Sequence, residues 1–307
     1  MTHQHPVRPT KFIPCPALSE RVNADVTLAS ETFQQTGSFK FRAAYHLASH
    51  MPNAHLAASS SGNFGQALAL ACRMLGKRCT IVMPGTSARV KVDAVRRYGA
   101  TVRLIDTATV SRAQALREIA AADPDVYSTN AYDNALIIAG NASLGREIGS
   151  VAPAFDAVIV PVGGGGLSSG VIVGLRELGV PALVYGAEPE IANDAARSLR
   201  AGRIIANESE PQTIADGART ISLGALNWPI LNERMAGILE ASEAEIRSGV
   251  RFLFREANLK AEPTGALSVA ALLRHPDAFR GQRVCCVVSG GNVDPSTYAS
   301  IIQEPAP

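Results

Sequence analysis

The chain has 307 residues, which suits one or two domains sharing a sizeable apolar core. Hydrophobic residues make up 47%, aromatic residues 5% and charged residues 18%, a balance typical of an α/β protein and not of a disordered chain. The 29 basic and 27 acidic side chains nearly cancel and form no cluster, which argues against a nucleic acid or a membrane surface as a partner.

Short β-branched runs alternate with helical patterns along the chain, as in parallel βαβ units. The predicted strands are Val26 to Ser30, His55 to Ser59, Cys79 to Met83, Thr101 to Ile105, Ala157 to Val162, Leu183 to Ala187 and Val284 to Ser289. The predicted helices between them include Gly65 to Leu75, Ala88 to Tyr98, Val110 to Ala122 and Leu167 to Leu178.

Three of the predicted strands end in loops rich in Gly, Ser and Asn, at residues 59–63, 163–166 and 289–292. Ligands of parallel α/β sheets bind beyond the carboxyl ends of the strands. We therefore expect the three loops to face one crevice.

The glycine loop Gly163, Gly164, Gly165 and Gly166 follows an apolar strand and opens a helix. Backbone N–H groups of successive glycines can approach an anion, and the helix N-terminus favours negative charge, so a phosphate is the expected guest. The loop fits neither G-x-G-x-x-G nor G-x-x-x-x-G-K-[ST], which disfavours a nucleotide. A turn with close helix packing is the alternative.

Lys40 lies in a helical pattern between Phe39 and Phe41. Partial desolvation disfavours the ammonium form and would make the amine a better nucleophile toward an aldehyde. Periodicity alone favours the simpler interpretation, a solvated helix lysine.

The five cysteines are interpreted as buried free thiols, because they form no C-x-x-C and have no histidine at zinc-ligand spacing. They are Cys15, Cys72, Cys79, Cys285 and Cys286.

The first residues, MTHQHPVRPTKF, lack the apolar stretch of a signal peptide, and no apolar run is long enough for a membrane span. We expect a cytoplasmic protein.

Six motifs occur in order along the chain, TGSFKFRAA, SSGNFGQAL, PVGGGGL, TIADG, EPTGA and VSGGNVD. Together they resemble serine racemase and the serine/threonine dehydratases, which are fold-type II pyridoxal phosphate (PLP) enzymes. The resemblance implies two open parallel-sheet α/β domains with the cofactor in the cleft between them. It implies a large cofactor-binding domain of residues 1–50 and 133–307, a small substrate-binding domain of residues 51–132, and a homodimer.

The resemblance also implies roles for individual residues. Lys40 becomes the catalytic lysine that carries PLP as a Schiff base, and Gly163, Gly164, Gly165 and Gly166 become the phosphate cup. Asn63 is expected to bond the phenolic oxygen and Ser289 to meet the pyridine nitrogen, and Phe39 and Glu262 complete the cofactor site. The substrate, a small amino acid, is expected to contact Ser60, Ser61, Asn63, Phe64, Tyr132, Gly217 and Thr220.

A hydroxyl at Ser289 leaves the pyridine nitrogen largely neutral, whereas a carboxylate would keep it protonated. A neutral ring favours elimination over transamination, so the expected reaction is dehydration of a β-hydroxy amino acid such as serine, threonine or hydroxyaspartate. Lys40 would act as general base on the Cα proton, and a keto acid and ammonia would be released. If Ser61 can return a proton on the opposite face, the enzyme also racemises serine.

The segment Glu188 to Asp194 places several oxygen ligands in one turn, which a hard cation prefers. A solvated acidic helix start is the simpler interpretation of the sequence. The racemase resemblance instead makes Glu188, the carbonyl of Ala192 and Asp194 ligands of Mg²⁺ or Ca²⁺.

Two positions depart from the family pattern near the expected substrate side chain. Phe64 stands where histidine is usual, and residues 130–134 lack the prolines common in that loop. Two other functions remain open, a β-replacement enzyme resembling cysteine synthase and a non-catalytic ligand sensor on the same fold.

Overall fold

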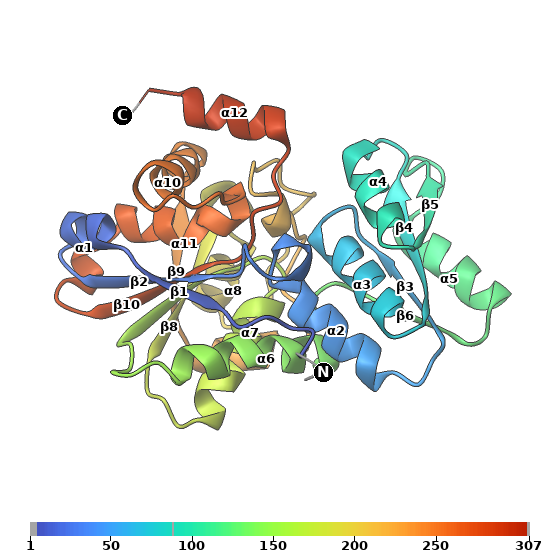
Figure 1. The fold of residues 1–307 in the computed structure, drawn as a ribbon, viewed down its shortest axis with the longest axis horizontal. Helices are drawn as coiled ribbons and strands as arrows, with labels where there is room; N and C mark the ends of the chain where they lie inside the picture. Colours follow the sequence, from blue (N-terminus) through green and yellow to red (C-terminus); the bar gives the residue numbers. More distant parts are fainter. Residues whose placement is uncertain (1–4, 88, 306–307) are drawn as a thin grey trace.

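A computed structural model describes residues 5–87 and 89–305. It contains a six-stranded and a four-stranded sheet, each covered by helices (Figure 1). Both the α/β class and the parallel sheets predicted from the sequence are confirmed.

The larger sheet has the strand order β1-β2-β10-β7-β8-β9. All its neighbours pair in parallel except β1 and β2, which are antiparallel, so β1 is an antiparallel edge strand that was not predicted. The bounds are β1 Lys11–Pro14, β2 Asp25–Ser30, β10 Arg283–Val288, β7 Ala157–Pro161, β8 Leu183–Pro189 and β9 Met235–Ala241.

Both faces of this sheet are buried. Cys286 packs into the core formed with α1 (Pro16–Val22), α10 (Glu243–Glu256) and α11 (Pro263–Arg274), whereas Cys285 packs into the core on the other face, with α6 (Ala135–Gly149) and α7 (Gly166–Glu177). A continuous apolar strand is what a sheet covered on both faces requires. All five cysteines are buried free thiols, as predicted.

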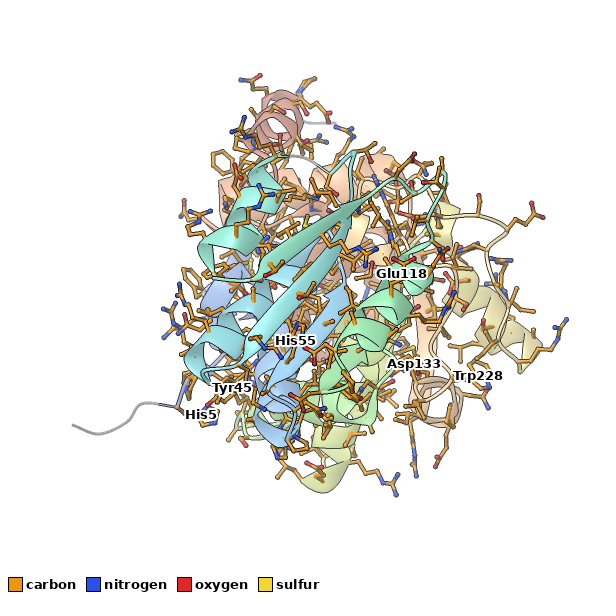
Figure 2. All side chains as sticks on the ribbon, turned by 90° about the vertical axis from the view of Figure 1, so that its right-hand side faces the viewer. His5, Tyr45, His55, Glu118, Asp133 and Trp228 are labelled. Atoms are coloured by element: carbon orange, nitrogen blue, oxygen red, sulfur yellow. The ribbon has the colours of Figure 1, made fainter. Side chains whose placement is uncertain are left out.

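The smaller sheet has the order β5-β4-β3-β6 and is parallel throughout. Its strands are β5 Thr101–Ile105, β4 Arg78–Pro84, β3 His55–Ser59 and β6 Val126–Thr129, and its helices are α3 Asn63–Met74, α4 Arg89–Arg97 and α5 Arg112–Ala122. His55, labelled in Figure 2, begins β3, and its ring nitrogens lie 2.8 Å from Asp123 Oδ2 and 2.8 Å from Thr80 Oγ1.

Helix α2 (Lys40–His50) packs against both α3 and α6 and so lies between the two sheets in Figure 1. The remaining helices are α8 Asp194–Ala201, α9 Trp228–Arg234 and α12 Pro295–Gln303. Four short 3₁₀ segments complete the fold, η1 Gln35–Gly37, η2 Glu190–Ala192, η3 Asp216–Ala218 and η4 Pro276–Phe279.

All seven predicted strands are present, and their ends differ from the prediction by no more than two residues. Val162 and Ser289, predicted as last strand residues, lie one residue beyond β7 and β10. Ala88, the predicted start of a helix, lies outside the described residues. Among the residues that the structure describes, no helix is long and apolar enough to cross a membrane.

Candidate active site

Lys40 begins helix α2, and its side chain is partly buried between the two sheets. Its Nζ donates to the carbonyl of Ala131 at 3.0 Å and lies 4.9 Å from the ring centre of Phe39 and 6.0 Å from that of Phe64. Burial lowers the pKa of Lys40 from 10.5 to about 8, against the opposing charge of Glu262. The amine is therefore partly neutral near neutral pH, as a nucleophile requires.

Asn63 is the first residue of α3 and is held by the side chains of Glu262 and Asn292, from the C-terminal part of the chain. Its Nδ2 donates to Glu262 Oε1 at 2.8 Å, and its Oδ1 accepts from Asn292 Nδ2 at 2.8 Å. Asn292 also donates to the carbonyl of Thr36 at 2.6 Å. The Thr36 carbonyl can only accept, so Asn292 presents its Nδ2 and Asn63 accepts through its Oδ1. The Asn63 Nδ2 then faces Glu262, and one of its N–H groups remains for a ligand.

Glu262 is 3% exposed and precedes the first residue of α11. Its burial, and then the negative charge of Asp216, raise the pKa of Glu262 to about 8, against the hydrogen bond from Asn63. Lys40, which is partly buried, and Glu262, which is buried, thus both have a pKa near 8, and perturbed pKa values of this kind are typical of functional sites.

The loop after β3 carries Ser60 and Ser61. The hydroxyl of Ser60 accepts from the backbone N–H groups of Gly62 at 3.3 Å and Gly65 at 3.2 Å. Its own O–H is therefore left to donate. Phe64, in the next turn, is 1% exposed and belongs to the core around α3.

The glycine loop joins β7 to α7. Gly165 has φ +91°, a conformation that favours glycine, and caps the N-terminus of α7. A Cβ at Gly163 would lie 2.7 Å from the carbonyl oxygen of Gly217, and one at Gly164 would overlap the ring of Tyr132. The glycines thus let the backbone pack closely at a helix N-terminus, where an anion is favoured.

Tyr132 is fixed beside the glycine loop by its neighbours. Asn227 Nδ2 donates to the carbonyls of Tyr132 at 3.1 Å and Gly164 at 3.0 Å. Asp133 accepts from the backbone of residues 225 and 226, and Figure 2 shows Asp133 and Trp228 on the same side of the molecule. The segment that lacks the family prolines is therefore held by polar contacts.

Ser289 directly follows β10 and is 1% exposed. Its carbonyl accepts from the N–H of Phe39 at 3.0 Å, and the next residue, Gly290, pairs with Ser38 in an isolated antiparallel bridge. Ser289 therefore contacts the backbone of the residue that directly precedes Lys40.

The structure brings most of the predicted site residues into one chain of contacts. Gly217 N donates to Thr264 Oγ1 at 2.9 Å, and the neighbouring Asp216 pairs with Lys91 of α4 at 2.9 Å. The carbonyl of Thr220 accepts from Asn207 Nδ2 at 3.1 Å, and the same nitrogen donates to Asp194 at 2.9 Å, so Thr220 contacts the segment of the predicted cation ligands.

The predicted cation ligands lie at the end of β8. Glu188 is 1% exposed and accepts from the N–H groups of Ala195 and Ala196. Asp194 is 2% exposed, its Oδ2 has no hydrogen-bond partner among the described residues, and burial raises its pKa to about 7. Within residues 5–87 and 89–305, no group of three His, Cys, Asp or Glu side chains could hold a metal ion.

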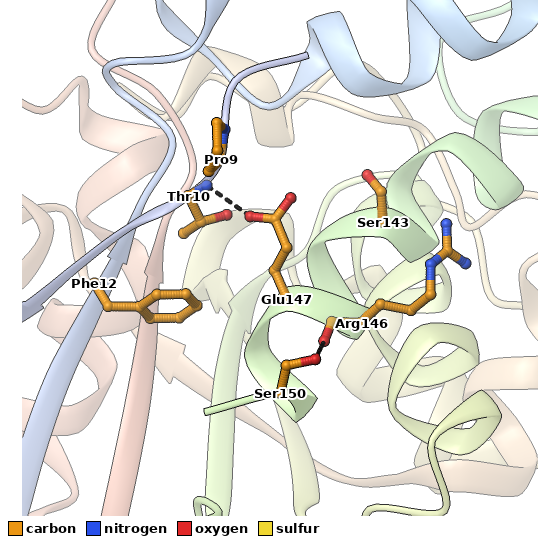
Figure 3. Close-up of a pocket in the computed structure, with 7 residues that line it drawn as sticks. All are labelled: Pro9, Thr10, Phe12, Ser143, Arg146, Glu147 and Ser150. Carbon is orange, nitrogen blue, oxygen red and sulfur yellow. Dashed lines mark hydrogen bonds between the residues drawn. The ribbon is translucent and has the colours of Figure 1, made fainter. Parts of the chain in front are cut away.

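A separate groove of about 510 Å³ lies elsewhere on the surface, and none of the predicted site residues lines it (Figure 3). Its described lining residues are Pro9, Thr10, Phe12, Ser143, Arg146, Glu147 and Ser150.

The two parallel sheets, the partly buried lysine with its lowered pKa and the glycine loop at a helix N-terminus together define a PLP enzyme. Residues 4–290 match the model of the family described as pyridoxal-phosphate dependent enzyme. The chain therefore belongs to this family.

Individual similar proteins are ammonia-lyases, a racemase and a deaminase. The chain is 40% identical to an L-threo-3-hydroxyaspartate ammonia-lyase of a Pseudomonas species, over 93% of this chain and 90% of that protein. It is 35% identical to the serine racemase of Schizosaccharomyces pombe, over 92% and 88% of the two chains. Among solved structures, a threonine deaminase of T.th. has a TM-score of 0.88 at 38% identity, covering 94% of each chain.

Two contacts of the cleft were not predicted from the sequence. The first is Asn292, which is part of the quoted VSGGNVD motif but received no role. The second is the ion pair of Lys91 with Asp216, whose partners are 125 residues apart. Asp216 belongs to the quoted TIADG motif, but Lys91 belongs to none of the motifs.

Proposed function

We propose that this protein is a PLP-dependent ammonia-lyase that dehydrates a β-hydroxy amino acid such as hydroxyaspartate, serine or threonine. The observation that carries the proposal is the partly buried Lys40 amine, with its pKa near 8, beside Asn63 and Glu262. The hydroxyaspartate ammonia-lyases among the similar proteins make L-threo-3-hydroxyaspartate the first substrate to test.

The residues present fit the cofactor. Gly163, Gly164, Gly165 and Gly166 offer backbone at the N-terminus of α7, where side chains would collide with neighbours, and would hold the phosphate. Asn63 has one N–H free for the phenolic oxygen, Ser289 offers a hydroxyl to the ring nitrogen, and Phe39 and Glu262 border the site. When bound, the cofactor supplies an electron sink for the pair released at the substrate Cα.

Lys40 would hold the cofactor and, once released from it by the substrate amine, act as general base. Because burial lowers its pKa, a useful fraction of the amine is neutral and can take the Cα proton. The carbonyl of Ala131, which accepts from Nζ, orients the amine between the aromatic rings. The β-hydroxyl then takes up a proton and leaves Cβ as water, and the enamine left behind takes up one water to give a keto acid and ammonia.

The loop after β3 would bind the substrate carboxylate. Ser60 uses its oxygen to accept two backbone N–H groups, so its O–H points a donor at the anion, and Ser61 and Asn63 add further donors. Phe64, Tyr132, Gly217 and Thr220 would surround the substrate side chain. Phe64 presents an apolar ring where the family usually has histidine.

A divalent cation, Mg²⁺ or Ca²⁺, would bind Glu188, Asp194 and the carbonyl of Ala192. Two buried carboxylates in one turn, one with an unpartnered oxygen, support this proposal, because buried anions need a counter-charge. The cation would fix α8 against β8.

The test is an assay of the purified enzyme with L-threo-3-hydroxyaspartate, L-serine and L-threonine, following the keto acid and the D-isomer. Keto acid and ammonia in equal amounts support the dehydratase, and D-serine would add racemase activity through Ser61. A product only from O-acetylserine and sulfide would indicate a β-replacement enzyme. A protein without Schiff-base absorbance would be a sensor.

The organisation of the whole molecule is also proposed. The strands of the smaller sheet all fall within residues 51–132, which supports a small substrate-binding domain there and a large domain of residues 1–50 and 133–307. We propose a cytoplasmic homodimer, in line with the buried free thiols and the family resemblance.

A further inference from the structure

The guanidinium of Arg42, in the first turn of α2, is buried. The residue is 1% exposed, and its guanidinium donates to carboxylates, hydroxyls and one carbonyl on several sides. The bonds are Nε to Glu31 at 2.7 Å, Nη2 to Glu31 at 2.9 Å, Nη1 to Glu147 at 2.7 Å, Nη2 to Glu147 at 3.2 Å, Nη1 to Ser143 at 3.0 Å, Nη2 to Thr10 at 2.8 Å and Nη2 to the Arg8 carbonyl at 3.2 Å.

These partners come from three separate parts of the chain. Glu31 directly follows β2, Glu147 and Ser143 lie on α6, and Thr10 belongs to the N-terminal segment. The partners also bond one another, since Thr10 donates from its hydroxyl to Glu31 at 2.8 Å and from its backbone to Glu147 at 2.6 Å. The latter bond is visible at the groove in Figure 3. The planar guanidinium fork of Arg42 thus connects α2 to the end of β2, to α6 and to the N-terminal segment.

Arg42 is two residues from Lys40 in the first turn of the same helix. Phe39 occupies the N-cap, and among the described residues no side chain caps this helix and its first turn has no acidic residue. Neither a side-chain cap nor an acidic residue, the two interactions that commonly stabilise the first turn of a helix, is found here among the described residues. On one side the turn is fixed by the backbone bond of Phe39 to Ser289, and on the other side by the Arg42 fork.

We propose that Arg42 is a positioning residue for Lys40. Its bidentate contacts to Glu31 and Glu147 fix the first turn of α2, and with it the point from which the Lys40 side chain enters the cleft. The effect is geometric, because the Arg42 guanidinium bonds Glu31, Glu147, Ser143, Thr10 and the Arg8 carbonyl, whereas the Lys40 amine bonds the Ala131 carbonyl. The inference rests on the proposed function, in which Lys40 moves the Cα proton.

The test compares Arg42→Lys with Arg251→Lys, a matched control. Arg251 is also buried, 7% exposed, and pairs with Glu304, but it lies on α10. Lysine keeps the charge and loses the fork. Each variant is assayed with the best substrate of the wild type, and its Tm is measured. The rate at which added PLP restores the Schiff-base absorbance of the apoenzyme gives a second readout of Lys40.

We expect both variants to lose thermal stability, and only Arg42→Lys to lose about tenfold to a hundredfold in kcat with KM changed less than about threefold. Its rate of cofactor incorporation should fall by a similar factor. Equal kcat and equal incorporation rates in the two variants would overturn the proposal and leave Arg42 a structural residue.

Glu147→Gln serves as a second variant, because it weakens the half-exposed arm of the network and leaves Glu31 in place. We expect kcat to fall about threefold in this variant. If Arg42→Lys does not fold, an unchanged kcat in Glu147→Gln overturns the proposal. If the wild type has no dehydratase activity but Arg42→Lys still incorporates the cofactor more slowly than the wild type, the proposed function is refuted and the role of Arg42 in positioning Lys40 stands.

Discussion

Replacing Lys40 by methionine should stabilise the cofactor-free protein. The same change should abolish the activity measured in the presence of the cofactor. The side chain is partly buried, and burial lowers its pKa from 10.5 to about 8. Folding at neutral pH must therefore place an ammonium group where the neutral amine is favoured. Methionine has a similar length, carries no charge, and would lie against the rings of Phe39 and Phe64.

The size of the gain follows from linkage. A fall of the pKa from 10.5 to about 8 corresponds to about 3 kcal/mol, which the partial exposure of the side chain reduces to about 2 kcal/mol. The lost hydrogen bond to the Ala131 carbonyl, 3.0 Å long, returns about 1 kcal/mol. We expect a net gain of about 1 kcal/mol, or about 2–4 °C in Tm.

The gain should depend on pH in a defined way. The folded-state pKa lies below the unfolded one, so between pH 8 and 10.5 the unfolded chain binds more protons and the wild type gains stability as pH rises. The advantage of Lys40→Met is therefore complete below pH 8 and disappears by pH 10.5.

The assay is urea unfolding of the apoproteins at pH 7 and at pH 10.5. Lys77→Met is the control, because Lys77 also donates to a backbone carbonyl, that of Met51, but lies on the far side of α3 from the site. An apoprotein of Lys40→Met that is less stable than the wild type at pH 7 would refute the reasoning, since it would show that the ammonium is not disfavoured.

Three further changes have defined outcomes. Gly164→Ala should weaken PLP binding at least about tenfold in a fluorescence titration, because its methyl would overlap Tyr132, whereas Gly237→Ala, with only ordinary contacts near 3.8 Å, should bind normally. Asn63→Ala leaves Glu262 and Asn292 without their partner, and should lower the free energy of unfolding by about 1–3 kcal/mol in urea titrations; equal stability would show that water replaces the amide. Prolonged chelation should lower the Tm of the wild type but not that of Glu188→Gln, and a wild-type Tm that is insensitive to chelation and to added Mg²⁺ or Ca²⁺ would contradict the cation site.

The sequence alone predicted the strands whose apolar runs are continuous, because a sheet covered on both faces needs them. It did not predict β1, β6 and β9, which lie at the edges of their sheets. An edge strand has one neighbour and a less apolar sequence, so its local pattern is a weak predictor of a strand. Helix α10 could have been predicted from its capping box, in which Ser242 and Glu245 bond reciprocally.

The site was predictable where chemistry constrains a local run, as in the four glycines and the lysine between two phenylalanines. The contact of Asn63 with Asn292 joins residues 229 apart, and that of Arg42 with Glu147 joins residues 105 apart. Such contacts depend on how the helices pack, which no local pattern records. An arginine in a helix is normally solvated, and only the fold shows that Arg42 is buried with two carboxylates.

The central claim is that Lys40 carries the cofactor. Borohydride reduction of the holoenzyme, followed by proteolysis and mass spectrometry, tests it most directly. The account predicts a phosphopyridoxyl group on Lys40 and its absence from every other lysine. A modified peptide from another lysine, or a reduced holoenzyme with an unmodified Lys40, would contradict it.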